Sequence, residues 1–396
     1  MAQRAPARRP RLLVLGAGPA QLGLLEAART RDLRVIAVDR DPQAPGFQLA
    51  DERAVISAED EPGVERLARA RKIDGLVSPG ADWPVGIAAR VAERMGLSHP
   101  INGATAVLTT TKTRQRERFA AVGVPQPRTF AVDDPALGVP CVVKAPDRQG
   151  QRGLTLVRDR AELPAALEAA VTASRGGSAL VEELVEGPEL TVNAVSIDGR
   201  FEPLTVTDRL TADPPAFGVA LAHAWPSVEE TGSAVEAARA AAEAVGIRNG
   251  PTYTQVRLGR GGPRVIELAA RLGGGHDAEL CRAAVGVDLN DLALSFALGG
   301  PPHGSVPRAS PRVGGACVLF LVAPEGELRD VGGVAEAETV PGVHWVRLYR
   351  RPGWRFGPLR RGADRAGAIL AVGADRDDAL GRARRAAQAV RFLVDA

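Results

Sequence analysis

The segment VIELAARLGGGHDAEL, residues 265–280, constrains the fold more than any other part of the sequence. It begins as a short apolar strand that contains Glu267, and a buried carboxylate needs a partner because an unpaired charge is costly to bury. Arg271 and the run Gly273–Gly275 follow, and then a helix for which Asp277 is the expected N-cap. Glycine amides and a helix N-terminus both favour a bound anion. The segment therefore predicts a site for metal-bound phosphate, with a Glu–Arg pair in a tight turn as the alternative.

The N-terminal part of the sequence alternates between strand and helix patterns. Residues 11–39 read as a strand, a glycine turn, a helix and a second strand. Gly16 and Gly18 begin a dinucleotide-type fingerprint, but Gln21 stands at its third glycine position. A Rossmann-like scaffold is therefore expected, and an NAD(P)-dependent oxidoreductase is the alternative from a different class. Asp82 follows a later strand, at the edge where such folds bind ligands, and is either a substrate contact or a helix cap.

Lysine is rare in this chain: it accounts for three of the 50 basic residues, namely Lys72, Lys112 and Lys144. A lysine kept in an arginine-rich sequence suggests a place where a compact ammonium group is needed. Lys112 stands at the head of a helix predicted from about residue 111 to 121, where a cation gains nothing from the helix dipole. We therefore expect an anion near Lys112, and a functional role for Lys144, which lies in an apolar strand.

Two further segments can contact a nucleotide. The loop DRQGQRG contains Gly150 and Gly153 and can close over phosphates, although a plain hairpin loop explains it equally well. The strand SALVEEL ends in Glu182 and Glu183, and the backbone that follows it can bind an adenine while Glu189 accepts hydrogen bonds from the ribose. A solvated acidic edge is the alternative for Glu182, Glu183 and Glu186. A hairpin is also predicted from residues 253–258 and 265–268, which would bring Gln255 and Glu267 to one metal ion.

Composition limits the partners and the compartment. The chain has 396 residues, enough for two or three domains, and its net charge of +3 comes without a basic stripe, so nucleic acid is not an expected partner. No apolar run reaches the length of a membrane span, and residues 1–10 read as a disordered tail without the apolar core of a secretory signal. Three cysteines share no metal-ligand spacing, which favours a reducing, cytoplasmic setting.

The motifs, taken in order, resemble those of the ATP-grasp enzymes. The resemblance rests on five segments that run in the family order: TKTRQRERFAAVGVPQP, PCVVKAPDRQGQRG, ALVEELVEGPEL, YTQVRL and VIELAARLGGGH. It implies a mixed α/β and α+β fold. A Rossmann-like pre-ATP-grasp domain would span residues 11–110, and an ATP-grasp core 111–305, with a lid at about 128–185. A linker, GGPPHGSVPRASPR, leads into a C-terminal α+β domain at 306–396, similar to that of biotin carboxylase.

The resemblance also implies roles for individual residues. In such enzymes, residues matching Lys112 and Lys144 contact ATP phosphates, and a loop matching residues 149–153 closes over them. Those matching Glu182 to Val185 frame the adenine, and the one matching Glu189 holds the ribose.

The metal site implied by the resemblance departs from the family pattern. The carboxylate matching Glu267 binds Mg²⁺, with Mn²⁺ as a substitute, and the first metal position, often Glu, is Gln255 here. A neutral amide can ligate the ion but adds no charge, so one or two metal ions are expected. Thr111 is the second departure, because the family often has Asp before its lysine.

The expected reaction is an ADP-forming ligation of a small acid, an amino acid by resemblance, to an amine. The acid would be activated as an acyl phosphate, with Arg271 and the amide of Gly274 holding the oxyanion and the departing phosphate. His276 could take the amine proton, or merely form a hydrogen bond at the start of a helix. Arg209, His223 and Trp225 are expected near the acceptor.

Three alternatives to this reaction stay open. The first is a bicarbonate-using carboxylase or carbamoyl-phosphate-type enzyme, the second is the oxidoreductase, and the third is an ATP-binding module without catalysis. A homodimer is common among such enzymes.

Overall fold

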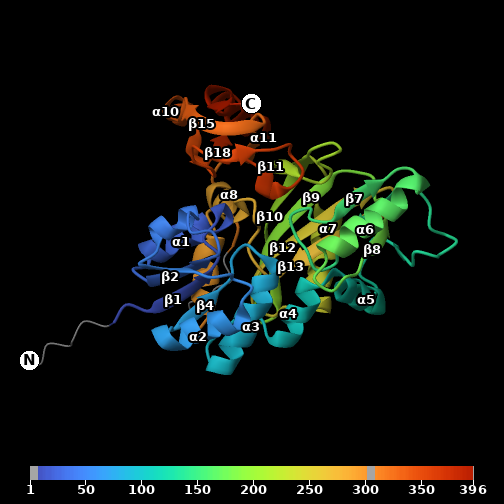
Figure 1. Ribbon diagram of the computed structural model, residues 1–396, viewed down its shortest axis with the longest axis horizontal. Coiled ribbons are helices and arrows are strands. Elements are labelled where there is room, and N and C mark those ends of the chain that lie inside the picture. Colours follow the sequence, from blue (N-terminus) through green and yellow to red (C-terminus); the bar gives the residue numbers. More distant parts are fainter. Residues whose placement is uncertain (1–7, 301–307, 396) are drawn as a thin grey trace, which may run out of the picture.

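A computed structural model describes residues 8–300 and 308–395 (Figure 1). Its first layer is a parallel sheet with the strand order β3-β2-β1-β4. The strands are β1 (Arg11–Leu15), β2 (Arg34–Asp39), β3 (Glu52–Val55) and β4 (Gly75–Val77). Three helices pack on it: α1 (Leu22–Thr30), α2 (Glu61–Arg71) and α3 (Asp82–Met95). Leu12 and Val14 belong to the core shared with α1, whereas Leu13 and Leu15 belong to the core shared with α2 and α3. Both faces are covered, which explains the continuous apolar strand.

The glycine turn after β1 is filled by the protein itself. A Cβ at Gly16 would lie 2.9 Å from the side chain of Gln21, so this side chain occupies the space in which a dinucleotide fingerprint admits a pyrophosphate. Asp39 accepts a hydrogen bond from the backbone of Ala17 at 2.9 Å and so closes the turn. This packing argues against the NAD(P) alternative.

The predicted N-terminal tail is too long. Residues 1–7 lie outside the described residues, but Arg8 forms an ion pair with Asp74 at 2.7 Å and Arg9 forms one with Asp32 at 2.8 Å. Residues 8–10 are thus tied to the first layer.

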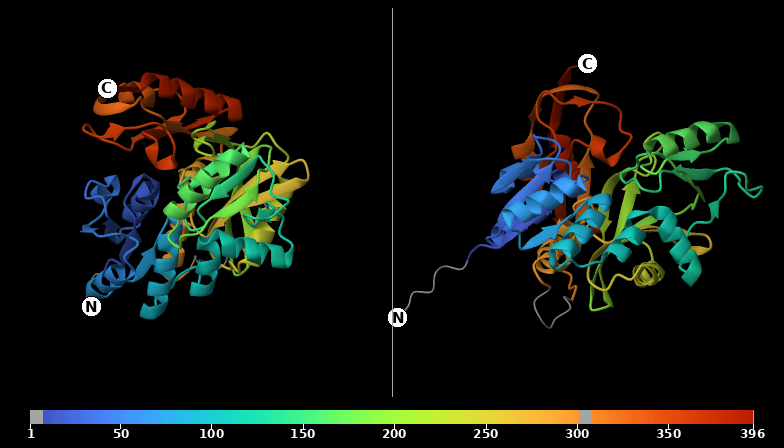
Figure 2. Two further views of the ribbon diagram at one scale, coloured as in Figure 1. Left: turned by 45° about the vertical axis from the view of Figure 1, so that its right-hand side comes forward. Right: turned by 60° about the horizontal axis from the view of Figure 1, so that its bottom comes forward.

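A small antiparallel sheet follows two helices, α4 (Gly103–Thr110) and α5 (Lys112–Val122). Its order is β5-β8-β6-β7, and helix α6 (Leu163–Ala173) packs on it. The strands are β5 (Thr129–Phe130), β6 (Cys141–Lys144), β7 (Leu154–Val157) and β8 (Leu180–Glu183). The small sheet and α6, drawn in green, project away from the blue N-terminal layer in both views of Figure 2.

The central feature is an eight-stranded sheet with the order β13-β12-β9-β10-β11-β14-β18-β16. Five strands come from the middle of the chain: β9 (Glu189–Ile197), β10 (Arg200–Thr211), β11 (Ala220–Trp225), β12 (Gly250–Gly259) and β13 (Gly262–Ala269). Three come from its C-terminal part: β14 (Gly315–Leu321), β16 (Val343–Leu348) and β18 (Gly367–Gly373). β14 pairs with β11 from Ala222↔Leu319 to Trp225↔Ala316. The C-terminal part therefore extends the central sheet by three strands, in addition to forming a short sheet of its own.

Five helices and a short fourth sheet complete the described part of the molecule. The helices are α7 (Gly232–Ala244), α8 (Asp277–Val285), α9 (Leu289–Ala297), α10 (Val334–Glu338) and α11 (Arg376–Ala389). The fourth sheet pairs β15 (Gly326–Gly332) with β17 (Arg355–Phe356) and β19 (Arg391–Asp395). Helix α11 ends at Ala389 because the residues that follow it pair with β15. No helix in the described part of the chain is long and apolar enough to cross a membrane.

Candidate functional site

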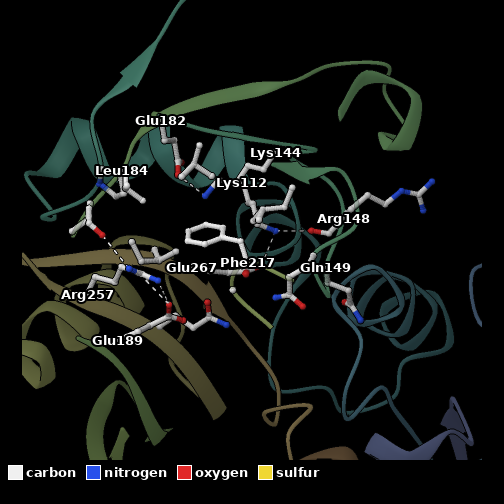
Figure 3. Close-up of a pocket in the computed structure, with 18 of the residues that line it drawn as sticks. Lys112, Lys144, Arg148, Gln149, Glu182, Leu184, Glu189, Phe217, Arg257 and Glu267 are labelled. Atoms are coloured by element: carbon white, nitrogen blue, oxygen red, sulfur yellow. Dashed lines mark hydrogen bonds and ion pairs between the residues drawn. The ribbon is translucent and has the colours of Figure 1, made fainter. Parts of the chain in front are cut away.

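Two neighbouring cavities meet at Glu267. The first, of about 90 Å³, lies between the small sheet and the central sheet and is lined by Lys112, Lys144 and Glu189 (Figure 3). The second, of about 370 Å³, is bounded by Arg271, the N-terminal layer and the C-terminal strands. Glu267 and Gln255 line both cavities. A group bound in the first cavity can therefore react with a group bound in the second.

The hairpin that carries this junction is formed as predicted. In the register of β12 and β13, Gln255 lies directly opposite Glu267. Glu267 Oε1 lies 2.7 Å from Lys112 Nζ, so the expected anion beside Lys112 is this carboxylate. Burial alone would raise the pKa of Glu267, but the charge and hydrogen bond of Lys112 and the charge of Arg271 hold it below its ordinary value. Glu267 is thus ionised and negative at neutral pH.

The donor set at the junction fits Mg²⁺. One carboxylate and one amide oxygen are hard ligands, and Mg²⁺ in such sites takes one or two protein ligands and completes its shell with phosphate oxygens and water. Gln255 Nε2 donates to Tyr253 Oη at 3.0 Å, which leaves the amide oxygen available as a metal ligand. No group of three or more His, Cys, Asp or Glu side chains suited to a metal occurs among residues 8–300 and 308–395. The site therefore fits a metal ion that arrives with a phosphate.

Lys144 lies in a buried charge cluster. Its Nζ lies 2.5 Å from Glu182 Oε2, and Arg116 Nε donates to Glu182 Oε1 at 2.7 Å. Burial lowers the pKa of Lys144, and Glu182 opposes that effect. The carboxylate of Glu182 thus forms ion pairs with both cations. The segment from Glu182 to Val185 also lines the first cavity. The sequence analysis missed Arg116, although its position four residues after Lys112 places both on one helix face.

Glu189 is also bound by two arginines. Its carboxylate meets Arg209 Nη1 at 2.7 Å and Arg257 Nη2 at 2.8 Å. The sequence analysis missed Arg257 and also Phe217, whose ring lines the same cavity (Figure 3). An apolar ring in this cavity suits a flat base, but nothing in the spacing of the sequence pointed to it.

The loop predicted to close over phosphates lies at the mouth of both cavities. Residues 149–152 line both of them. Gly150 and Gly153 have φ values of +66° and +65°, a conformation that favours glycine. Gly153 itself packs against Ala173 and Ala145, while the side chain of Gln149 accepts a hydrogen bond from the backbone of Asp82. The loop thus touches both the small sheet and the N-terminal layer.

Arg271 and the glycine run shape the floor of the second cavity. Arg271 Nε donates to Asp82, so this carboxylate positions an arginine and is not a helix cap. Gly274 and Gly275 line the cavity. A Cβ at Gly275 would lie 2.8 Å from His223 Nε2, so glycine is required there. Burial lowers the pKa of His223 to about 4, which makes this cavity-lining histidine neutral at pH 7.

Three predictions about the second cavity are corrected. His276 holds the N-cap position expected for Asp277, and it does not line the cavity but lies behind Tyr349, whose hydroxyl it contacts. Trp225 lies outside both cavities because its strand turns it toward the main apolar core. The C-terminal part, for which no site residue was predicted, supplies five cavity-lining residues: Tyr349, Arg350, Gly362, Ala363 and Arg365.

Comparisons with known proteins agree on one family. Residues 137–279 match the family described as "ATP-grasp domain", and residues 319–395 match "L-amino acid ligase C-terminal domain 2". A formate-dependent phosphoribosylglycinamide formyltransferase of Burkholderia lata is 30% identical over 410 residues, covering 96% of this chain and 95% of that protein.

Solved structures share the fold over almost the whole chain. An L-amino acid ligase from Bacillus licheniformis has a TM-score of 0.85 at 22% identity, with 98% of this chain and 100% of that chain covered. A phosphoribosylglycinamide synthetase from Anaerococcus prevotii has a TM-score of 0.79 at 19% identity, with the same coverage. The predicted mixed α/β and α+β fold is confirmed.

Proposed function

Since the chain belongs to the ATP-grasp superfamily of carboxylate–amine ligases and uses ATP and Mg²⁺, we propose that it joins a small amino acid to an amine that bears an anionic group. The observation that carries this proposal is the shared wall of the two cavities. Glu267 and Gln255 face both, so a nucleotide in the first cavity can pass its terminal phosphoryl group to a carboxylate in the second. The product is an amide or a dipeptide.

The site residues divide between the two substrates. Lys112, Lys144 and the loop with Gly150 and Gly153 hold the phosphates, Glu182 to Val185 frame the adenine, and Glu189 meets the ribose. Glu267 and Gln255 would hold Mg²⁺, which acts as a Lewis acid on phosphoryl oxygens when bound.

The remaining groups surround the reacting acid. Arg271, fixed by Asp82, and the amide of Gly274 stabilise the oxyanion and the departing phosphate. Neutral His223 and the charged Arg209 border the place of the acceptor.

The anionic group is proposed from two arginines of the second cavity. Arg350 donates to the carbonyl oxygens of Ala363 and Tyr349, and Arg365 to those of Gly362 and Ala220. Neither forms an ion pair with any described residue, and both line the cavity. Burial lowers the pKa of both guanidinium groups, and the nearby carboxylates offset that effect only in part. A carboxylate or phosphate on the acceptor would provide the remaining compensation, because arginine binds both in bidentate fashion.

Replacing Arg365 with glutamine should reduce discrimination between an amino-acid acceptor and its carboxamide. The native enzyme is expected to prefer the carboxylate, and R365Q should lower the ratio of the two kcat/KM values by about 10- to 100-fold, as for a lost charge-assisted bond. The measurement is product formation with each acceptor. R351Q, which changes an exposed arginine outside both cavities, is the control. An unchanged ratio in R365Q would contradict this role.

The reaction class is tested with purified protein, ATP, Mg²⁺ and pools of amino acids, with and without hydroxylamine. ADP and phosphate that depend on the acid, with hydroxamate trapped, are expected. Formate and bicarbonate are tested as acids in separate reactions. Formate is the second candidate, because the relative that is 30% identical is described as formate-dependent. AMP and pyrophosphate as products would overturn the proposal, and ATP binding without turnover of any acid would favour a non-catalytic module.

We also propose three domains: a pre-ATP-grasp domain at residues 11–110, an ATP-grasp core at 111–305 with a lid at about 128–185, and a C-terminal domain at 306–396. The protein is proposed to be a cytoplasmic homodimer that acts on small molecules. Light scattering during gel filtration would test the dimer.

A further inference from the structure

Three side chains form a continuous hydrogen-bonded chain that leads away from the second cavity. Tyr349 lines that cavity, and Glu279 lines an outer groove of about 710 Å³ bounded by α1, α8 and β16. His276 lines neither, is 3% exposed, and lies between them. Its Nε2 lies 2.6 Å from Tyr349 Oη, and its Nδ1 lies 3.1 Å from Glu279 Oε1. Each member is thus in direct contact with the next.

The partners of His276 favour one arrangement of its protons. Burial would raise the pKa of Glu279, but hydrogen bonds from His276 and Arg347 and the charge of Arg347 lower it, so Glu279 is ionised. Arg347 Nη1 lies 3.3 Å from His276 Nδ1 but only 2.6 Å from Glu279 Oε1, so its hydrogen bond goes to the carboxylate. An ionised carboxylate only accepts hydrogen bonds, so the contact of Nδ1 with Glu279 favours the tautomer of His276 that carries its proton on Nδ1. Nε2 is then the acceptor, and Tyr349 donates its hydroxyl proton to it. The lone pairs of Tyr349 Oη are left for a donor in the cavity.

The charges around this chain favour movement of a proton toward His276. On the cavity side, Arg350 and Arg365 are positive. On the far side, Arg347 is shared between Glu279 and Glu26, at 2.6 Å from each, which leaves one net negative charge. A proton is therefore repelled at one end and attracted at the other.

The backbone of His276 is strained in support of this placement. Its φ is +61°, in the left-handed region that non-glycine residues rarely adopt and that is costly to maintain. The edge-on ring of Trp345, at 5.0 Å, holds the imidazole in position. A histidine that served only to start a helix would not need this conformation.

We propose that Tyr349, His276 and Glu279 form a proton relay that converts the incoming ammonium group into a reactive amine. The inference rests on the proposed function. One N–H proton of the ammonium passes to Tyr349 Oη while the hydroxyl proton of Tyr349 passes to His276 Nε2, and Glu279 stabilises the resulting imidazolium. The free amine then forms the C–N bond as the bond from the acyl carbon to the phosphate oxygen breaks. Its second proton leaves with the phosphate as HPO₄²⁻, and the relay returns its own proton to water after product release.

The chemical test compares two nucleophiles. Hydroxylamine is mostly unprotonated at pH 7 and does not need the relay, whereas an amino acid is an ammonium ion. Y349F and H276N, in which asparagine tolerates the left-handed backbone, should lower the rate with the amino acid relative to hydroxylamine by about 100-fold. ADP released per amide formed should rise, because the stalled acyl phosphate hydrolyses. H344N, which changes an exposed histidine of β16, is the control. An equal loss with both nucleophiles would indicate a structural role and overturn the relay.

The second test needs no turnover and separates failure of the relay from failure of the proposed function. Long-range ¹⁵N spectra of the five histidines, with H276N for assignment, should show His276 protonated on Nδ1 and bare on Nε2. E279Q should change that signal, because its neutral amide no longer holds the proton on Nδ1. A proton on Nε2 in the native protein would overturn the relay whatever the enzyme's substrates are.

Discussion

Replacing Glu267 with glutamine should lower the rate of ADP formation by at least about 10³-fold, because a Lewis-acid metal contributes several kcal/mol to phosphoryl transfer and Glu267 is the carboxylate of the proposed pair of metal ligands. The same change removes the negative charge that Lys112 contacts at 2.7 Å. The measurement is steady-state ADP release over a range of Mg²⁺ concentrations, with unfolding temperature recorded in parallel.

The control for Glu267 is E202Q, which changes a carboxylate of strand β10 outside both cavities. It should keep native turnover. A folded E267Q protein with native turnover and unchanged Mg²⁺ dependence would sink the assignment of this residue to the metal.

Replacing Glu182 with alanine should lower the free energy of unfolding by about 3–5 kcal/mol, because it leaves Lys144 and Arg116 buried without their counter-charge. The measurement is urea unfolding at pH 7, with E186A as the exposed control, which should stay within about 0.5 kcal/mol of the native value. A native midpoint for E182A would show that the cluster contributes nothing to stability.

The pH dependence of this difference has a definite sign. The charges of Arg116 and Lys144 hold the pKa of Glu182 below 4.5 in the folded protein, although burial opposes them. Its ionised form therefore adds stability above pH 4.5, the unfolded value, and that stability is lost as the pH falls below it. The gap between native protein and E182A should shrink in acid, and a gap that widened there would contradict the assignment.

The local sequence pattern was enough to predict that the two residues lining both cavities lie next to each other. Alternation along a predicted hairpin places residues of one face opposite each other, and Gln255 does lie across from Glu267. The rarity of lysine pointed to Lys112 and Lys144, and both line the first cavity. These inferences succeed because each needs only short-range geometry or composition.

The partners of these residues could not be predicted in the same way. Arg116 and Glu182 are 66 positions apart and meet only after the small sheet closes over α5. Arg257 and Glu189 are brought together by the pairing of β12 with β9. Sequence spacing carries no information on such contacts, because they depend on how separate elements pack.

The acceptor side of the second cavity was missed for a topological reason. Arg350 and Arg365 flank loops that read as ordinary surface segments, and only the pairing of β14 with β11 brings them to the cavity. The orientation of the His276 side chain was also not predicted, because the neighbouring sequence does not indicate a positive φ at a histidine. Trp225 was misplaced because alternation along β11 gives two faces without saying which one is the core.

The continuity of the eight-stranded sheet has a consequence for selectivity. Glu267 lies in β13 at one edge, while Tyr349 and Arg350 follow β16 at the other edge and Arg365 precedes β18. The span from Glu267 to Arg350 and Arg365, the residues proposed to bind the metal and the acceptor, is thus set by hydrogen-bonded strands. Whatever displacement the small sheet undergoes over a nucleotide, that span keeps its length. We therefore expect this constant span to limit the combined size of the two substrates. Changes in the small sheet should alter affinity for the nucleotide without altering which acids and amines are joined.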